Sequence, residues 1–371
     1  MYRSPDFKIL TIEETNPPEL SYGVKMIGAP LEWPETRGKG IKVAVIDTGA
    51  PKHPDVKVTE AIAFAGGDAF DERGHGSHTS GIIAANGKIK GVAPEVDLYC
   101  LKVAEPKSRG GLNTNAITKA LEWCCDNGID VINMSLGGPT NDSEIEKACK
   151  ACYDAGIAII CSAGNLGLDF GVMYPAHLPT TIAVAAVDVN KVRPGFSAVG
   201  KELDIAAAGV EVCSTWLDGK YALLSGTSMA APHITGAVAL LQAKALIRLG
   251  TKLTPDEVKK TLKIYAEDLG IKGPDDRYGC GVFSFGRFDG SEVIPQQPSQ
   301  EHQIDMWINN PVVEIDGIKK ELPVEPILHP RTKAHTMVPV RFISDELAKL
   351  FDKPINVGWN EKEQRITIKT K

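Results

Sequence analysis

The sequence predicts an α/β protein of three layers, with a mostly parallel central sheet between two layers of helices, followed by a small C-terminal α+β module. Short apolar runs alternate with segments of helical spacing through most of the chain, and this alternation is typical of a parallel sheet covered on both faces. Polar or glycine-rich turns follow several of these runs. In parallel sheets, ligands bind beyond such carboxyl ends of the strands. Near the C-terminus, a Pro/Gln/Ser-rich stretch precedes a segment of paired short strands.

The strands and helices follow in order from this alternation. Buried strands are expected at residues 41–46, 97–103, 130–134, 157–161 and 181–187, which are short and largely apolar. Helices are expected at residues 79–85, 115–127, 143–155 and 230–249, and after Thr254. Gly128 and Gly156 each follow a helix, as glycine does at left-handed helix ends. Thr254 suits a helix cap, with Pro255 at the first helical position.

The chain is expected to divide into four segments. These are an N-terminal extension of residues 1–18, a main domain of residues 19–290, a linker of residues 291–303 and a C-terminal module of residues 304–371. In the module, hairpins are expected over residues 311–322 and 356–369, turning at Asp316-Gly317 and Asn360-Glu361, with a short helix over residues 344–350.

The composition is that of an ordinary globular protein, with 43% hydrophobic and 24% charged residues. The net charge of -6 gives no basic footprint for nucleic acid. No apolar run is expected to span a membrane, and no signal-peptide core is visible. The 8 cysteines lack the paired CxxC spacing of a zinc site, so thiols in a reducing, cytoplasmic compartment are expected. The alternative is an exported protein whose signal peptide is missing from this chain.

The stretch LSGTSMAAPHITG, residues 224–236, sets one hydroxyl, that of Ser228, among small apolar residues. One interpretation is the capped start of a buried helix. The other is a nucleophile at a helix N-terminus, which needs a base because a neutral hydroxyl reacts weakly. Asp47 ends the first strand, and His75 lies between two glycines, where backbone can approach closely. His75 and His78 could also be half of a metal site, but no third ligand accompanies them, and we expect His78 to point into packing.

Three separated stretches resemble the signatures of the subtilisin-like serine proteases, in that family's Asp-His-Ser order: VAVIDTG (43–49), GHGSHTSGIIAA (74–85) and LSGTSMAAPH (224–233). The similarity covers residues 16–290, and its layout is similar to that of intracellular bacterial subtilisins. It implies the subtilisin fold and a serine endopeptidase of broad specificity that cleaves proteins through an acyl-enzyme. The alternative is a catalytically silent binding or regulatory protein on the same scaffold. An α/β-hydrolase esterase is excluded, because residues 226–230 do not form a GxSxG elbow.

The resemblance implies a role for each site residue. Ser228 is the nucleophile, His75 takes and returns its proton, and Asp47 orients the imidazole. The side-chain amide of Asn165 and the backbone N–H of Ser228 would donate to the oxyanion.

Substrate recognition is carried over in the same way. An extended peptide would lie between two edge segments, one at Gly110, Gly111 and Leu112 and the other at Ser135, Leu136, Gly137 and Gly138. The specificity pocket would lie between the second edge and Ser162, Ala163 and Gly164. Met173 would either form its base or pack in the core. A medium or large apolar P1 residue is expected.

The resemblance also implies features outside the catalytic centre. Residues 1–18 have the place of an inhibitory extension, with residues 8–12 across the cleft; a frayed terminus is the alternative. No catalytic metal is implied. A weak structural site for Ca²⁺ or Na⁺ maps onto the carbonyls of Ala176, Leu178 and Thr181 and the carboxylate of Asp204, with a solvated strand edge as the alternative. The tight calcium site is not expected at Asp55, because residues 84–91 are short and carry two lysines.

The Tyr174–Pro175 bond is expected to be cis, and a homodimer is expected only by analogy with intracellular relatives. The C-terminal stretches INNPVVEIDG (308–317), TMVPVRFISDEL (336–347) and VGWNEKEQRITIK (357–369) resemble the small module named from the N-terminal region of copper amine oxidases. That resemblance implies a binding or spacing element and no copper chemistry.

Overall fold

The computed structural model describes residues 2–3, 8–13, 17–105, 111–168, 171–287, 303–307, 312–315, 318–321, 355–360 and 365–370. The chain forms two compact units, Met1–Ile294 and Pro295–Lys371.

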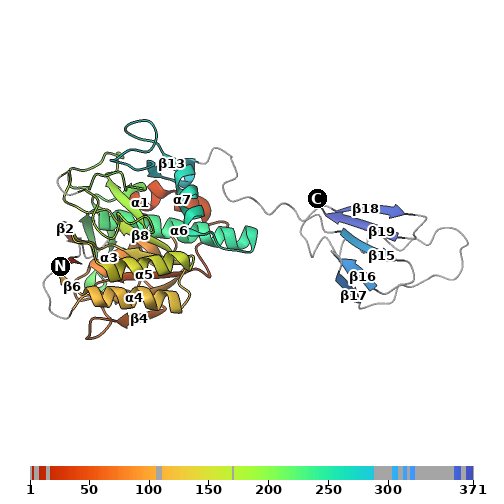
Figure 1. The fold of residues 1–371 in the computed structure, drawn as a ribbon, viewed down its shortest axis with the longest axis horizontal. Helices are drawn as coiled ribbons and strands as arrows, with labels where there is room; N and C mark the ends of the chain where they lie inside the picture. Colours follow the sequence, from red (N-terminus) through yellow and green to blue (C-terminus); the bar gives the residue numbers. More distant parts are fainter. Residues whose placement is uncertain are drawn as a thin grey trace, which may run out of the picture. The chain divides into compact units, whose positions relative to one another are not determined.

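The first unit is built on a 9-stranded sheet in the order β13-β14-β10-β9-β8-β7-β3-β5-β4 (Figure 1). All neighbouring strands of this sheet are parallel except β13 and β14. The strands are β3 (Lys42–Asp47), β4 (Glu60–Ala63), β5 (Asp97–Lys102), β7 (Val131–Met134), β8 (Ala158–Ser162), β9 (Ile182–Val187), β10 (Ile205–Ala208), β13 (Ala266–Glu267) and β14 (Val282–Phe283). The central strands are continuously apolar because helices cover both of their faces.

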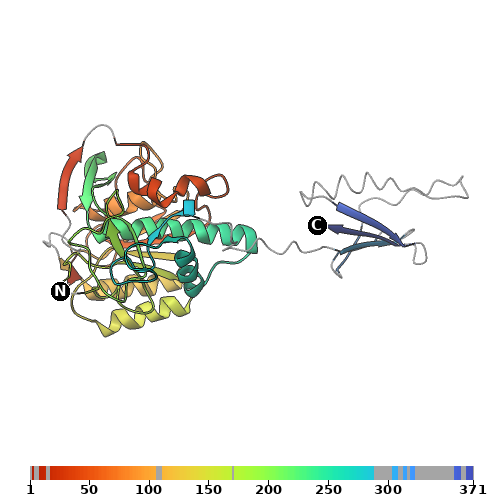
Figure 2. The ribbon, with the colours of Figure 1, turned by 90° about the horizontal axis from the view of Figure 1, so that it is seen from above.

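Two layers of helices enclose this sheet. One apolar core, on the face covered by α3 and α6, contains residues from α1, α7 and the sheet. The other core lies between the sheet and the pair α4 and α5, which pack side by side (Figures 1 and 2). The helices are α1 (Tyr22–Ile27), α2 (Ala29–Glu32), α3 (His75–Ala84), α4 (Thr114–Asp126), α5 (Ser143–Asp154), α6 (Thr227–Leu249) and α7 (Pro255–Ile264), with short 3₁₀ turns at Leu217–Gly219 and Phe285–Arg287. The three-layer α/β expectation is therefore confirmed.

Helix α6 passes through the first unit and contacts strands β7 to β10. Contrary to the sequence expectation, its length and apolar composition would suit a membrane span. However, 89% of its most apolar window is buried inside the unit, which is the ordinary situation of a core helix. A helix that is apolar on every side needs such a burial.

Two helices begin earlier than the sequence pattern predicts. The helix expected from Thr79 begins at His75, and the helix expected from Ala230 begins at Thr227. In both cases the first N–H groups are bound by side chains from other parts of the chain. Asp71 accepts from the N–H of Ser77 at 2.8 Å, and Asn165 accepts from the N–H of Thr227 at 2.8 Å. Periodicity cannot reveal partners that lie outside the helix.

Two small sheets complete the first unit. One has the order β11-β12-β2, with β11 at Val212–Thr215, β12 at Tyr221–Ser225 and β2 at Lys8–Glu13. In Figure 2, β2 and β12 run alongside each other. The other sheet pairs β1 (Tyr2–Arg3) with β6 (Gly111–Leu112).

The second unit contains a 5-stranded antiparallel sheet in the order β17-β16-β15-β19-β18. Its strands are β15 (Gln303–Trp307), β16 (Val312–Ile315), β17 (Ile318–Glu321), β18 (Ile355–Asn360) and β19 (Arg365–Thr370). Pairing of Ile315 with Ile318, and of Asn360 with Arg365, gives two hairpins over the expected segments. Asn360, expected in the second turn, is instead the last residue of β18. The helix expected over residues 344–350 lies outside the described residues.

Two fully buried histidines belong to the packing. The Nε2–H of His78 donates to the carbonyls of Val212 and Ala222, both at 3.0 Å, as expected for a histidine that points into packing. His233 lies in α6 and donates its Nδ1–H to the carbonyl of Met229 at 2.7 Å. Burial disfavours the charged ring and lowers the pKa of His78 to about 3 and that of His233 to about 4.

These histidines predict a loss of stability in mild acid. In the unfolded chain their pKa is near 6.5, so their contribution is complete above that pH. It falls as the pH drops from 6.5 towards 4 and then 3, because only the unfolded chain takes up the protons. Between pH 7 and pH 5 each ring should lower the free energy of unfolding by about 2 kcal/mol, measured by urea denaturation. His78→Gln should weaken this dependence, whereas the control Ser143→Ala, which changes an exposed side chain that does not titrate, should not. An unchanged slope in His78→Gln would contradict the assignment.

Candidate active site

The centre of the site is a buried carboxylate–imidazole pair. Asp47 ends β3, and His75 is the first residue of α3. The Nδ1 atom of His75 lies 2.7 Å from Oδ1 and 2.9 Å from Oδ2 of Asp47. Because an ionised carboxylate only accepts hydrogen bonds, Nδ1 carries the proton and Nε2 is the basic nitrogen of the neutral ring. The side chains are 0% and 2% exposed, so the pair is shielded from water.

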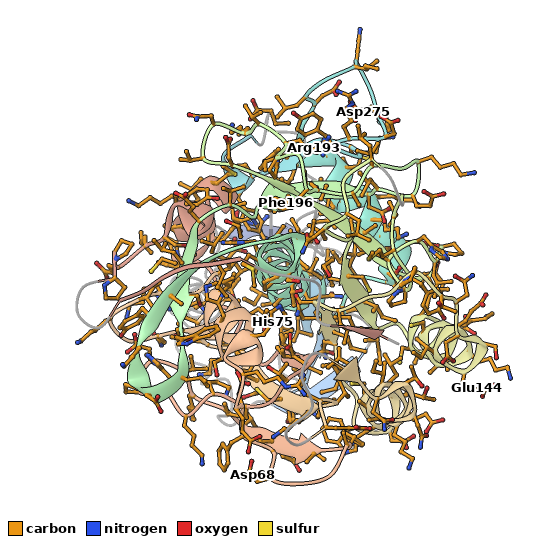
Figure 3. The ribbon with its side chains drawn as sticks, turned by 90° about the vertical axis from the view of Figure 1, so that its left-hand side faces the viewer. Asp68, His75, Glu144, Arg193, Phe196 and Asp275 are labelled. Atoms are coloured by element: carbon orange, nitrogen blue, oxygen red, sulfur yellow. The ribbon has the colours of Figure 1, made fainter. Side chains whose placement is uncertain are left out.

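Other donors fix the carboxylate of Asp47. The backbone N–H of Thr48 donates to its Oδ1 at 2.6 Å, and the hydroxyl of Thr79 lies 3.4 Å from its Oδ2. Figure 3 shows His75 near the centre of the first unit in that view, whereas Asp68, Glu144 and Asp275 lie towards its outer edge.

The glycines on either side of His75 permit close backbone approach. A side chain on Gly76 would lie 2.5 Å from the carbonyl oxygen of Gly49. Gly74 has a φ of +87°, and a side chain there would meet the ring of Trp216 at 2.4 Å. Helix α3 can therefore begin against β3, with His75 beside Asp47.

Ser228 is the second residue of α6, and its carbonyl has an unusual partner. Pro232, four residues later, has no N–H to complete the helical hydrogen bond. The hydroxyl of Ser135 donates to this carbonyl at 2.9 Å instead. The hydroxyl of Ser228 in turn lies 3.4 Å from the carbonyl of Ser135. The two serines therefore join the start of α6 to the segment after β7.

A short polar chain extends this link into the core. The side-chain N–H of Asn133 donates to the hydroxyl of Ser135 at 3.1 Å. The hydroxyl of Thr235, from the third turn of α6, donates to Oδ1 of Asn133 at 2.9 Å. All three side chains are fully buried, so these bonds form without competition from water.

Thr227 orients Asn165. Its N–H and its hydroxyl both lie 2.8 Å from Oδ1 of Asn165. The amide nitrogen is thereby directed away from Thr227, and it lies 3.1 Å from the place of a side chain on Gly226. Asn165 is among the residues that the sequence predicts for the site, whereas Thr227, which immediately precedes Ser228, is not.

The described residues place the expected pocket segments side by side. Tyr174 exchanges two backbone hydrogen bonds with Gly138, at 2.9 and 3.0 Å, and the N–H of Met173 donates to the carbonyl of Ala163 at 2.9 Å. Met173 thus lies between the segment Ser135–Gly138, which includes Leu136 and Gly137, and the segment Ser162–Gly164. Its Cγ would be 2.7 Å from a side chain on Gly164. The expected cis bond between Tyr174 and Pro175 is confirmed.

The first edge is already paired with the chain's own N-terminus. In β6, Leu112 pairs with Tyr2 and Gly111 with Arg3, in antiparallel register. Gly110 lies outside the described residues. Residues 8–12, expected across the cleft, instead belong to β2 and pair with β12, where Lys8 is opposite Ser225. The strand on the expected substrate edge is therefore β1.

The four residues expected to hold a weakly bound cation do not fit one well. The hydroxyl of Thr181 already lies 3.0 Å from the carbonyls of Ala176 and Leu178. Nζ of Lys259 lies 3.4 Å from Oδ1 of Asp204, and Oδ2 of Asp204 accepts from the N–H of Ala183 at 2.8 Å. The ammonium supplies the positive charge that a cation would bring, so we assign no metal here. Among the described residues, no cluster of His, Cys, Asp and Glu suits a metal ion.

Asp55 is also satisfied by the protein itself. Its Oδ2 accepts from the N–H of Ile89 at 3.1 Å and from the hydroxyl of Tyr221 at 2.8 Å. Burial raises the pKa of Asp55, but these hydrogen bonds outweigh burial and hold the pKa below its usual value.

The hydrogen bond between the Ser135 hydroxyl and the Ser228 carbonyl should contribute measurably to the free energy of unfolding. Ser135→Ala leaves a buried carbonyl without its hydroxyl partner and should lower the free energy of unfolding by about 1–3 kcal/mol. Chemical denaturation measures the change. Ser143→Ala, which removes an exposed hydroxyl at the start of α5, is the matched control and should lie within about 0.5 kcal/mol of the parent. Equal effects of the two changes would contradict the assigned role.

Comparisons with known proteins agree with this architecture. The sequence profile of the Subtilase family matches residues 38–281. Subtilisin DY of Bacillus licheniformis is 40% identical over 273 residues, which cover 71% of this chain and 96% of that protein. Subtilisin BL of Lederbergia lenta is 37% identical over 267 residues, covering 70% and 95%. The thermostable alkaline protease of Halalkalibacterium halodurans is 38% identical over 255 residues, covering 67% and 68%. The chain therefore belongs to the subtilase family of serine proteases.

Proposed function

We propose that this serine endopeptidase is catalytically active and that Asp47, His75 and Ser228 carry its chemistry. The observation that carries the proposal is the buried pair of His75 Nδ1 and Asp47 Oδ1, 2.7 Å apart. This contact fixes the tautomer in which Nε2 can accept a proton, and the carboxylate stabilises the ring once it is charged. Ser228, at the start of α6, supplies the hydroxyl.

The reaction follows from these positions. His75 accepts the proton of Ser228 as its oxygen attacks the peptide carbonyl, and then donates a proton to the leaving amine. The resulting acyl-enzyme is hydrolysed by water with His75 again as the base. Asn165, held by Thr227, and the backbone N–H of Ser228 donate to the oxyanion. Because the first N–H groups of a helix have no intrahelical carbonyl partner, the start of α6 suits a developing negative charge.

The second candidate is a silent binding protein on the same scaffold. A scaffold without catalysis would not need a buried acid against the histidine, because a buried charge is costly unless it is compensated. Here the charge of Asp47 is compensated by hydrogen bonds from the N–H of Thr48 and from Nδ1 of His75, and the second of these also orients the ring. This pattern favours catalysis.

We infer that substrates are extended protein segments held mainly by backbone pairing at Gly111–Leu112 and Ser135–Gly138. Met173, which lies against Gly164, would form the base of the pocket for the P1 side chain. An apolar P1 residue of medium size suits a pocket with a thioether at its base.

The N-terminal strand β1 would act as an inhibitor. A peptide bound at β6 needs the backbone groups that Tyr2 and Arg3 already occupy. A tethered segment competes at an effective concentration in the millimolar range, although its own affinity is low. Residues 1–18 are therefore proposed as an inhibitory extension, and residues 19–290 as the peptidase domain.

The relatives named above are bacterial proteins. All 8 cysteines lie in the described residues as thiols, which suits a cytoplasmic protein; export is the alternative.

The C-terminal module, residues 304–371 after the linker 291–303, is proposed as a binding or spacing element. No observation on the described residues supports a homodimer, and we do not propose one.

Hydrolysis of casein by the full chain tests the proposed catalysis. The parent enzyme should release peptides, and Ser228→Ala should lower the rate by at least about 1,000-fold, because the nucleophile is lost. A serine-directed covalent inhibitor should abolish the parent activity. Ser225→Ala, in the same segment but outside the triad, is the control. Equal rates for the parent and Ser228→Ala would contradict the mechanism.

Removal of β1 tests the proposed inhibition. Deletion of residues 1–3 takes away only the strand on the substrate edge and should raise kcat/KM for a short peptide substrate about tenfold or more. Deletion of residues 1–16 removes β2 as well and should give at least the same activity. An unchanged kcat/KM in both deletions would contradict the inhibitory role. It would not affect the conclusion about the triad, which the casein experiment tests separately.

A further inference from the structure

Four cysteines meet where α4 packs on α5. Cys124 and Cys125 belong to the last turn of α4, and Cys149 and Cys152 lie one turn apart in α5. The sulfur atoms of Cys125 and Cys152 are 2.9 Å apart. A disulfide bond is about 2.05 Å long, so a small movement would bring these atoms to bonding distance.

The surroundings distinguish this pair from its neighbours. Cys124, Cys149 and Cys152 are completely buried, whereas Cys125 is partly exposed. The thiol of Cys152 also lies 3.3 Å from the carbonyl of Leu121, one turn before Cys125 on α4, so it is held against that helix. Cys125 is thus the thiol that a dissolved reagent can reach, and Cys152 is the second thiol already in place behind it.

We propose that Cys125 and Cys152 are a reversible redox modification site, which low-molecular-weight disulfides such as glutathione disulfide convert into an intramolecular disulfide. The thiolate of Cys125 attacks one sulfur of the reagent, and one glutathione thiolate leaves. The thiolate of Cys152 then attacks the Cys125 sulfur and displaces the second glutathione. Two electrons pass to the reagent, and two thiol protons appear on glutathione or in solution.

Burial sets the order of these two steps. It raises the pKa of Cys152 far above that of an exposed thiol, which makes Cys152 a slow first nucleophile. The second step needs no diffusion, because the two sulfurs are already in contact.

The crosslink would constrain a functional part of the chain. It spans 27 positions and encloses β7 and the segment Ser135–Gly138. Such a closed loop restricts the unfolded chain and stabilises the fold. It would also tie together α4, which begins just after the edge strand β6, and α5, which begins just after the other edge.

The test uses the full chain carrying Ser228→Ala to prevent self-digestion, incubated with glutathione disulfide and then with a thiol-alkylating reagent under denaturing conditions. We expect the number of alkylated cysteines to fall from 8 to 6 per chain. Mass spectrometry of tryptic peptides should show the Cys125 and Cys152 peptides joined. The melting temperature should rise by about 5–10 °C and return to its starting value with a reducing agent.

Two variants and one control locate the effect. Cys125→Ser and Cys152→Ser should each abolish the crosslink and the rise in melting temperature, and Cys125 is exposed enough for the serine variant to fold. Cys280→Ser, which changes another partly exposed cysteine, should keep both effects. Eight alkylated cysteines after oxidation, a crosslink that survives Cys125→Ser, or stable glutathione on Cys125 without crosslinking would each overturn the proposal.

Discussion

The hydrogen bond from the Ser135 hydroxyl to the Ser228 carbonyl is the contact on which the arrangement of the site depends. Pro232 removes the helical partner of that carbonyl, and a buried carbonyl without a partner is costly. Ser135 meets this requirement from the segment after β7. Because Pro232 interrupts the hydrogen-bond ladder of α6, the carbonyl of Ser228 is bound to an expected substrate edge instead. The neighbouring Thr227 binds Oδ1 of Asn165, so the first turn of α6 holds two other segments of the site in place.

The second constraint is the exclusion of water from the site. The carboxylate of Asp47 and the ring of His75 are almost completely buried, and so are the side chains of Ser135, Thr227 and Ser228. In such surroundings each hydrogen bond is stronger than in water, and each missing partner is more costly. The buried donors and acceptors of the site therefore bind one another, and the fold sets their geometry before any substrate binds. Near Asp204, the positive charge is supplied by Lys259, whose Nζ lies 3.4 Å from the Asp204 carboxylate.

The sequence predicted much of this because the chemistry of the site lies in short contiguous stretches. Asp47, His75, Asn165 and Ser228 each stand beside glycines or small residues at the ends of strands or starts of helices, where local pattern is informative. The sequence could not predict contacts made at long range. The hydrogen bond of Ser135 to the Ser228 carbonyl and the pairing of Tyr2–Arg3 with Gly111–Leu112 each join segments far apart in the chain. The proximity of Cys125 and Cys152 has the same origin, because it depends on the packing of two helices. The cap that Asp71 provides for α3 spans only six positions, but it lies outside the helix and therefore outside the periodic pattern.

The central claim is that the Asp47–His75 pair activates Ser228, and covalent labelling tests it most directly. A fluorophosphonate should attach once per chain, and peptide mass spectrometry should locate it on Ser228. Asp47→Asn, which keeps the shape of the side chain but no longer favours the required tautomer, should slow the labelling by at least about 100-fold. Labelling at another residue, or an equal rate in the parent and in Asp47→Asn, would contradict the account.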